Sequence, residues 1–210
     1  MKFEIGIPTL NRADLLIPTL LLYRKDFPDT KIHILDNGKQ GLKERYNKIA
    51  DIEESETNIG VAASWNFLCD KIFQTSDYAL ILNDDVYMRK NAQDIEDIIT
   101  KKQNKGCFLR MPKDWCAFIL SKKIWEKVGR FDEEFFPAYY EDKSYEYRMK
   151  LAGVPMTKTP SLIPYIYKSS MTIDKDASIY EASKINKQRY IDMWGGEPTQ
   201  EKFKTPKNIL

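Results

Sequence analysis

Cysteine is scarce in this chain of 210 residues, which contains three: Cys69, Cys107 and Cys116. None of them is spaced as a CxxC pair, and an odd number argues against a framework of disulfide bonds. Small secreted domains that depend on disulfides are a poor match for such a chain. We therefore expect reduced thiols, most of them in the core, and a cytoplasmic location.

Long apolar runs and a large net charge are also missing. No run approaches the roughly 20 residues of a membrane span, and the start MKFEIGIPTLNR does not have the pattern of a signal peptide. Lys plus Arg number 33 against 31 Asp plus Glu, a net charge of +2, so no strong whole-molecule field is expected. With 42% hydrophobic and 30% charged residues, the chain is typical of a soluble protein with one sizeable core and no membrane span.

Charge is uneven along the chain. Residues 101–130 contain nine Lys/Arg and two acids, a net of +7, whereas residues 131–146 contain six acids and one Lys, a net of −5. A basic segment followed by an acidic one suits an anionic substrate beside a metal or a catalytic carboxylate. Solvated loops of opposite sign are the alternative.

Short apolar runs alternate with helical periodicity. In YALILN (78–83) the apolar residues are continuous, as expected of a strand covered by helices on both faces. Leu15, Thr19 and Leu22, at i, i+4 and i+7, indicate a helix. This alternation predicts an α/β sandwich with a mostly parallel sheet. The expected strands are 3–8, 31–36, 78–83, 106–111 and 116–121; the expected helices are 15–22, 42–49, 61–72, 95–99, 122–128 (N-capped by Ser121), 142–151 and a Lys-rich stretch from about 173.

Polar motifs follow three of these strands: PTLNR (8–12), DNG (36–38) and NDD (83–85). Ligands of parallel sheets lie at the carboxyl ends of the strands. The adjacent carboxylates of Asp84 and Asp85 repel each other, and neither is stable in a dry place without a partner. We therefore expect a divalent cation at this edge.

Five blocks, IPTLNR, LDNG, NIGVAASWNFL, LILNDDV and GRFDEEFFPAYYEDKSYEYRMKLAG, resemble in order and approximate spacing the GT-A fold, family 2-like inverting glycosyltransferases. The resemblance covers roughly residues 3–170. It implies a GT-A nucleotide-diphospho-sugar transferase domain, a Rossmann-like sandwich, over 1–172, with a C-terminal helix and basic tail, 173–210, packed on it. It also implies a nucleotide-sugar donor, with UDP as the common family case.

The donor contacts implied by the resemblance begin in the first loop, which meets the nucleoside. Asp36 would recognise the nucleobase, although it can instead be an Asx-turn residue before Gly38, and Arg12 can be an ordinary surface charge. N–H groups at the start of helix 61–72 can meet an anion or a sugar hydroxyl, or form only a cap and turn. The implied donor-binding residues are Pro8, Thr9, Asn11, Arg12, Asp36, Asn58, Gly60, Asn66, Asn83, Asp84 and Lys168.

Asn83-Asp84-Asp85 resembles the family's DxD motif with Asn in the first position. Hard oxygen ligands suit Mg²⁺ or Mn²⁺, with Asp85 expected on the metal and Asp84 on ribose or a metal-bound water; a turn without function is the alternative. Relatives often supply a late His as a further ligand, but the single His, His33, lies in an expected strand and core. Lys168 stands near that late position, so either the metal keeps an extra water or Lys168 contacts the diphosphate.

Glu141-Asp142 opens a helix after the aromatic loop FFPAYY. The resemblance assigns the catalytic base of a single displacement to Asp142, with Glu141 beside it in the acceptor site. Carboxylates also favour a helix start electrostatically, which is the structural alternative. Trp115, Tyr139 and Tyr140 are candidate acceptor contacts through ring stacking, or core residues.

The acceptor is open. The ending RYIDMWGGEPTQEKFKTPKN resembles tails of small glycosyltransferases of bacteria and their phages, which favours the cytoplasm of a bacterium or of a phage-infected host. From Lys184 to Leu210 there are six Lys/Arg and three acids, so a hydroxylated base in DNA joins saccharides and lipid-linked molecules as an acceptor. A nucleotidyltransferase and a non-catalytic nucleotide- or sugar-binding module are the rival functions. We expect a monomer or a weak homodimer.

Overall fold

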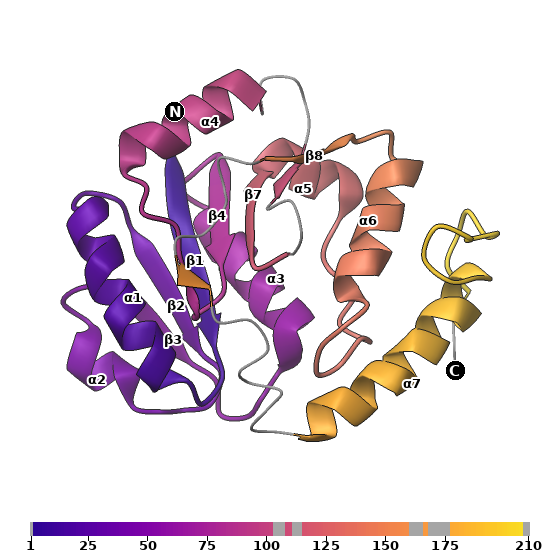
Figure 1. The fold of residues 1–210 in the computed structure, drawn as a ribbon, viewed down its shortest axis with the longest axis horizontal. Coiled ribbons are helices and arrows are strands. Elements are labelled where there is room, and N and C mark those ends of the chain that lie inside the picture. The colour runs from indigo at the N-terminus through magenta and orange to yellow at the C-terminus, as the bar shows by residue number, and fades with distance from the viewer. Residues whose placement is uncertain (1, 103–107, 111–114, 160–165, 168–176, 208–210) are drawn as a thin grey trace.

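The computed structural model describes residues 2–102, 108–110, 115–159, 166–167 and 177–207. Its centre is a seven-stranded sheet of order β3-β2-β1-β4-β7-β6-β8. Helices lie on both faces of this sheet (Figure 1). The expected α/β sandwich is therefore confirmed.

The four strands β3, β2, β1 and β4 form a parallel half of the sheet. Because Thr9 is in register with Asp36, the carboxyl ends of β1 and β2 reach the same edge. This edge carries all three predicted motifs. The strand bounds are Phe3–Thr9 for β1, Ile32–Asp36 for β2, Asp51–Glu54 for β3 and Tyr78–Leu82 for β4.

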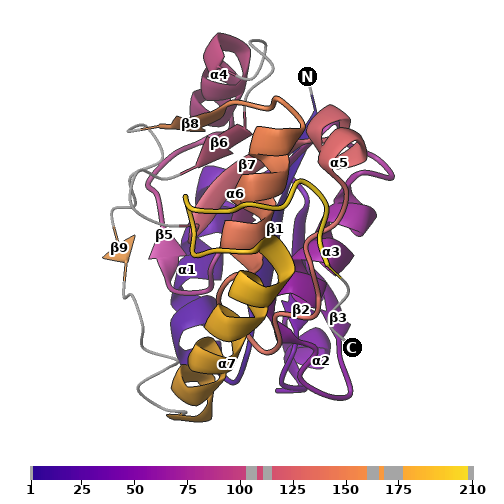
Figure 2. The same ribbon diagram turned by 90° about the vertical axis from the view of Figure 1, so that its right-hand side faces the viewer.

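The other half of the sheet is mixed. β7 is antiparallel to both β4 and β6, and β6 is parallel to β8. A separate two-stranded sheet pairs β5 with β9, which lie apart from the main sheet (Figure 2). The bounds are Val86–Tyr87 for β5, Phe108–Arg110 for β6, Ala117–Ser121 for β7, Met156–Lys158 for β8 and Ile166–Tyr167 for β9.

Alternate residues of the strands supply two cores. Leu80 and Leu82 of β4 belong to the core under α1 and α4, while Ala79 and Ile81 belong to the core under α3, α5 and α6. The continuous apolar run of this strand thus follows from burial on both faces. The helix bounds are Ala13–Asp26 for α1, Leu42–Tyr46 for α2, Gly60–Ile72 for α3, Ala92–Lys102 for α4, Lys122–Val128 for α5, Glu141–Leu151 for α6 and Ala177–Trp194 for α7.

The late helix α7 contacts α6 through a third apolar cluster of Phe135, Tyr147, Tyr190, Met193 and Trp194. The Trp194 indole Nε1 donates to Ser144 Oγ at 3.2 Å, and the Tyr147 and Trp194 rings lie 4.9 Å apart, edge to face. Over the residues that the structure covers, no helix is long and apolar enough to cross a membrane.

Several elements differ from the sequence predictions. Ser121 does cap α5, accepting from Ile124 N at 3.2 Å, but the second helix ends at Tyr46 rather than near residue 49. β3, β5, β8 and β9 were not predicted. β3 has one buried apolar residue, Ile52, between charged ones, and two-residue strands have no periodicity to detect.

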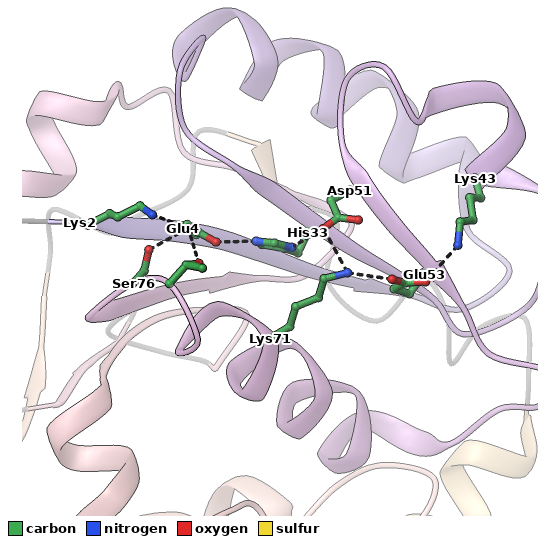
Figure 3. A network of polar contacts seen from close by, with 9 residues as sticks. Lys2, Glu4, His33, Lys43, Asp51, Glu53, Lys71 and Ser76 are labelled. Atoms are coloured by element: carbon green, nitrogen blue, oxygen red, sulfur yellow. Dashed lines mark hydrogen bonds and ion pairs between the residues drawn. The ribbon is translucent and has the colours of Figure 1, made fainter.

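A network of charged and polar side chains, with Glu4 and His33 buried and Lys2 and Asp51 exposed, crosses the parallel strands (Figure 3). His33 Nε2 lies 2.6 Å from Glu4 Oε2, and His33 Nδ1 lies 3.2 Å from Asp51 Oδ2. Glu4 Oε1 also accepts from Thr75 and Ser76 at 2.9 Å each. His33 is therefore buried as predicted, but between two carboxylates rather than among apolar side chains.

Candidate active site

The loops after β1 and β2 are joined to each other. Asn37 N donates to Thr9 O at 2.8 Å, and Ala13 N donates to Gln40 Oε1 at 2.8 Å. Gly38 lies so close to the first loop that an added Cβ would be 2.3 Å from Asn11 Oδ1. The DNG sequence thus needs its glycine for the close approach of two loops.

Asp36 is fully buried and is used within its own loop. Its Oδ2 accepts from Gln40 N at 2.7 Å, and its Oδ1 accepts from Gln40 Nε2 at 2.9 Å and from Gly38 N at 3.3 Å. These contacts match the Asx-turn alternative. Nucleobase recognition by Asp36 stays a prediction.

The segment before α3 is fastened to the same edge by amides. Asn37 Nδ2 donates to Asn58 Oδ1 at 2.9 Å, and Asn37 Oδ1 accepts from Ile59 N at 2.8 Å. Asn58 Oδ1 also accepts from Gly60 N at 2.9 Å. Asn37, which is not among the predicted donor contacts, therefore links β2 to α3, and its place in DNG was the available signal.

Asp84 is hydrogen-bonded to residues of two other elements, β1 and α1. Thr9 Oγ1 donates to Asp84 Oδ2 at 2.8 Å, and Thr19 Oγ1 donates to the Asp84 carbonyl at 3.2 Å. Burial raises the pKa of Asp84 to about 7, in spite of the bond from Thr9, and the charge of Asp85 adds to the rise. The predicted strain between adjacent carboxylates is thus present at this strand end.

Arg12 is the cation of this edge. Its side chain is 1% exposed, so the alternative of an ordinary surface charge is wrong. Nε and Nη2 donate to Asp14 at 2.9 and 3.0 Å, and the charges of Asp84 and Asp85 act on it as well. Its buried Nη1 has no hydrogen-bond partner among the described residues. Arg12 therefore has a donor left for an anionic ligand.

The chemistry of these oxygens fits a divalent cation. Among the described residues no group of three or more His, Cys, Asp and Glu side chains could form a complete metal cage. Mg²⁺ and Mn²⁺ do not need one, because they keep waters and share themselves with substrate phosphates. Asp84 and Asp85 would hold the ion, and its charge would relieve the repulsion between them. Asn83, whose N–H donates to Cys116 O at 2.8 Å, sets where the strand ends.

Glu141 and Asp142 begin α6 after two tyrosines with left-handed backbone, Tyr139 and Tyr140, both at φ 74°. Glu141 is 5% exposed, and its Oε2 has no hydrogen-bond partner in the described part of the chain. Burial, then the charge of Asp142, raises the pKa of Glu141 well above its usual value. Glu141 is therefore held where its charged form is disfavoured.

Asp142 differs from its neighbour because it has a cation beside it. Lys143 N donates to Asp142 Oδ1 at 2.7 Å, and Lys143 Nζ lies 3.6 Å from Oδ2. Burial raises the pKa of Asp142; Lys143 opposes the rise and Glu146 adds to it. A carboxylate with a raised pKa is a stronger base and is suited to general-base work.

Two of the predicted contacts, Asn66 and Trp115, are buried among other structural elements. Asn66 is fully buried and binds the Phe131 backbone on both sides, at 2.8 and 2.9 Å. Trp115 is 4% exposed, packs against Trp65 and Phe108, and donates to Glu146 at 2.7 Å. Both therefore have structural contacts, which for Trp115 is the core alternative. Lys168 lies outside the described residues.

Comparisons with protein-family models and with curated protein sequences find no match. Solved structures do match in fold. A mannosyltransferase from Pyrobaculum calidifontis, in complex with GDP-mannose and Mn²⁺, has a TM-score of 0.60 at 14% identity, over 78% of this chain and 56% of that one. The chain thus spans just over half the length of that mannosyltransferase chain.

Two further structures are similar. A protein from Desulfovibrio desulfuricans assigned as a nucleotide-diphospho-sugar transferase has a TM-score of 0.55 at 10% identity, over 90% of this chain and 99% of that one. Glucosyl-3-phosphoglycerate synthase from Mycobacterium tuberculosis, with Mn²⁺, UDP and glucosyl-3-phosphoglycerate, has a TM-score of 0.57 at 9% identity, over 88% and 78%. At these identities the likeness defines the fold, and it is the GT-A fold expected from the sequence.

Proposed function

We propose that the protein is a glycosyltransferase that moves a sugar from a nucleotide-diphosphate donor to an acceptor hydroxyl. The observation that carries this proposal is the pair Asp84-Asp85 at the carboxyl edge of the sheet, with the buried Arg12 beside it. Such an edge is where ligands of parallel sheets bind. The similar structures that contain a nucleotide or nucleotide sugar together with Mn²⁺ support the assignment.

The residues would divide the work between donor and acceptor. Asp84 and Asp85 would hold Mn²⁺ or Mg²⁺, whose charge would stabilise the departing diphosphate. The loop of Pro8, Thr9, Asn11 and Arg12 would contact the donor, and the free Nη1 of Arg12 can donate to a phosphate oxygen. Asn58, Gly60 and Lys168 remain proposed donor contacts.

The reaction we propose is a single displacement with inversion. Asp142 takes the proton of the acceptor hydroxyl while the oxygen of that hydroxyl forms a bond to the anomeric carbon of the donor sugar. The bond from the anomeric carbon to the diphosphate oxygen breaks in the same step. The raised pKa of Glu141 disfavours a second negative charge beside the base. Tyr139 and Tyr140 are part-exposed at the start of the same helix, where they can pack on the acceptor.

The basic tail gives limited support to a DNA acceptor. Lys184 pairs with Glu181 and Lys187 with Glu197, each at 2.9 Å, so part of the positive charge of α7 is neutralised. Saccharide or lipid-linked acceptors remain the alternatives. A salt-titrated binding assay with DNA would separate them, because phosphate-driven binding falls steeply with salt.

The test is a panel of nucleotide sugars, each with Mn²⁺, Mg²⁺ or EDTA, scored by thermal stabilisation and by release of nucleoside diphosphate. A donor that binds only the folded state raises its stability by RT ln(1 + [L]/Kd). We expect a metal-dependent shift for one nucleotide. A shift that survives EDTA would mean that Arg12 and Lys168, rather than a metal ion, neutralise the diphosphate. No shift for any donor would overturn the proposal. Pyrophosphate release from nucleoside triphosphates with a sugar phosphate would instead identify a nucleotidyltransferase.

A further inference from the structure

The segment that leads into Glu141-Asp142, residues 132–140 (the base loop), is fastened by side chains from distant elements. Asn186 of α7 donates from Nδ2 to Ala138 O at 2.8 Å and to Phe136 O at 3.2 Å. The carbonyl between them, Pro137 O, accepts from Val61 N of α3 at 2.8 Å. Three consecutive carbonyls of the base loop are therefore held alternately by α7 and α3.

Asn186 is built into this position. It is fully buried, and its Oδ1 accepts from Arg189 Nη1 at 2.8 Å. The same Nη1 also donates to Glu134 O. Nδ2 of Asn186 thus joins the base loop to α7, while Oδ1 holds Arg189, whose Nη1 also reaches the loop. A buried amide with both polar atoms bonded is costly to replace.

The base loop needs such support because its backbone is strained. Tyr139 and Tyr140 both have φ 74°, a region that non-glycine residues rarely adopt and that persists only where the surroundings enforce it. On the α3 side, Gly60 leaves no room for a side chain, since a Cβ would lie 2.9 Å from Phe136 Cδ2. The loop is thus pressed against α3 while Asn186 holds it from α7.

We propose that Asn186 is a positioning residue of the transferase: by holding the carbonyls of Phe136 and Ala138 it fixes the strained turn that places Asp142 opposite the donor. The inference rests on the proposed function, because Asp142 is the base only in a glycosyltransferase. Asn186 touches no reacting atom, so its effect reaches the reaction through the base loop. An error of about 1 Å in such placement can cost 10²-fold in rate.

The test compares Asn186→Asp with Gln188→Ala. The first has nearly the same shape, but a carboxylate cannot donate to the two carbonyls. The second removes an exposed side chain of the same helix that bonds only to Asp192 in the structure. We expect Asn186→Asp to lower kcat for transfer by tenfold or more while the donor Kd stays within twofold. Amide exchange at Val61 should become faster, and Gln188→Ala should change none of these.

Arg189→Ala gives the same test in a milder form, and it serves if Asn186→Asp does not fold. An unchanged kcat in a folded Asn186→Asp variant would overturn the inference, as would a loss of donor affinity in proportion to kcat. If the parent chain transfers no sugar from any donor, the proposed function is wrong. In that case the exchange rate at Val61 still decides whether Asn186 holds the base loop.

Discussion

Two acids at opposite ends of the parallel strands, Glu4 and Asp84, have opposite environments. At the amino-terminal part, Glu4 is met by His33, Thr75, Ser76 and Lys2. Burial acts to raise the pKa of Glu4, but the hydrogen bonds from these partners outweigh it and leave the pKa lowered. At the carboxyl edge, burial dominates and the pKa of Asp84 rises to about 7.

A similar contrast separates the acids of β3 from the acid that begins α6. Asp51 and Glu53 share the ammonium of Lys71 at 3.1 and 2.9 Å, whereas Glu141 is buried with one oxygen that bonds to no described residue. Carboxylates whose oxygens have hydrogen-bond donors or cations beside them stabilise the fold. Those that it has left short of positive charge are the ones that a cation, a substrate or a transferred proton can complete.

The largest expected effect is on transfer rather than on stability. Asp142→Asn keeps the shape of the side chain but removes the base, so kcat should fall by about 10³-fold. Asp85→Ala should abolish the metal-dependent stabilisation by the donor. Asp97→Asn, an exposed change on α4, is the matched control. Full activity in both Asp142→Asn and Asp85→Ala would show that neither carboxylate has the role proposed for it.

Glu4→Gln should have the largest effect on stability. Removing one charge of a buried, hydrogen-bonded pair leaves its partners uncompensated, and we expect a loss of about 3 kcal/mol. Because the pKa of Glu4 is lowered in the folded state, its contribution is present above pH 4.5 and disappears as the pH falls through the folded value. Urea unfolding of both proteins at pH 7 and pH 3.5 measures this: the difference should shrink at the lower pH. Donor binding should persist in Glu4→Gln at pH 7.

Asp84→Asn should act in the opposite direction. A carboxyl with a raised pKa stabilises the fold only while protonated, so the parent chain should lose stability as the pH rises from about 4 to about 7. The variant lacks that loss and should be more stable at pH 8 by about 2 kcal/mol, a gain that vanishes near pH 4. Thermal unfolding against pH is the measurement. Mn²⁺ should stabilise the parent chain more than the variant, and the opposite order would contradict the metal assignment.

Lys43→Ala should have the smallest effect. Lys43 Nζ lies 3.1 Å from Glu53 Oε2, but both side chains are exposed, at 53% and 39%. Such pairs contribute about 0.5 kcal/mol or less, and added salt should reduce this contribution further because it screens exposed charges. A loss above about 1 kcal/mol would mean that the network of Figure 3 extends further toward solvent than the burial pattern indicates.

Local patterns were enough to predict most of the sheet and its helices. The apolar run 78–83 predicted β4, because a strand buried on both faces is apolar throughout. The helical periodicity of apolar residues predicted α1 and α3. The sequence of β3 has neither an apolar run nor an alternating pattern. Its acids Asp51 and Glu53 are both paired with Lys71 of α3, a contact that adjacent residues do not encode.

The site was predictable in its motifs but not in its contacts. NDD and ED indicated Asp84, Asp85 and Asp142, whose roles stay predictions, whereas the bond from Thr9 to Asp84 joins residues 75 apart. Asn66 belongs to a sequence block of the predicted donor site, yet its amide serves the backbone of Phe131. Asn186 lies in a Lys-rich helix with no motif, so only the packing of α7 could identify it.

The hydrogen bonds from Asn186 to the base loop have a consequence for folding during protein synthesis. Asn186 follows Asp142 by 44 residues, and a ribosome adds residues at roughly 5–20 per second. The carboxyl edge of the parallel strands, formed from the first 85 residues, can thus assemble seconds before Asp142, the proposed base, is fixed in place. During this interval a nascent chain could hold a donor without being able to transfer the sugar, so competence for catalysis would arrive with the last helix described rather than with the binding site.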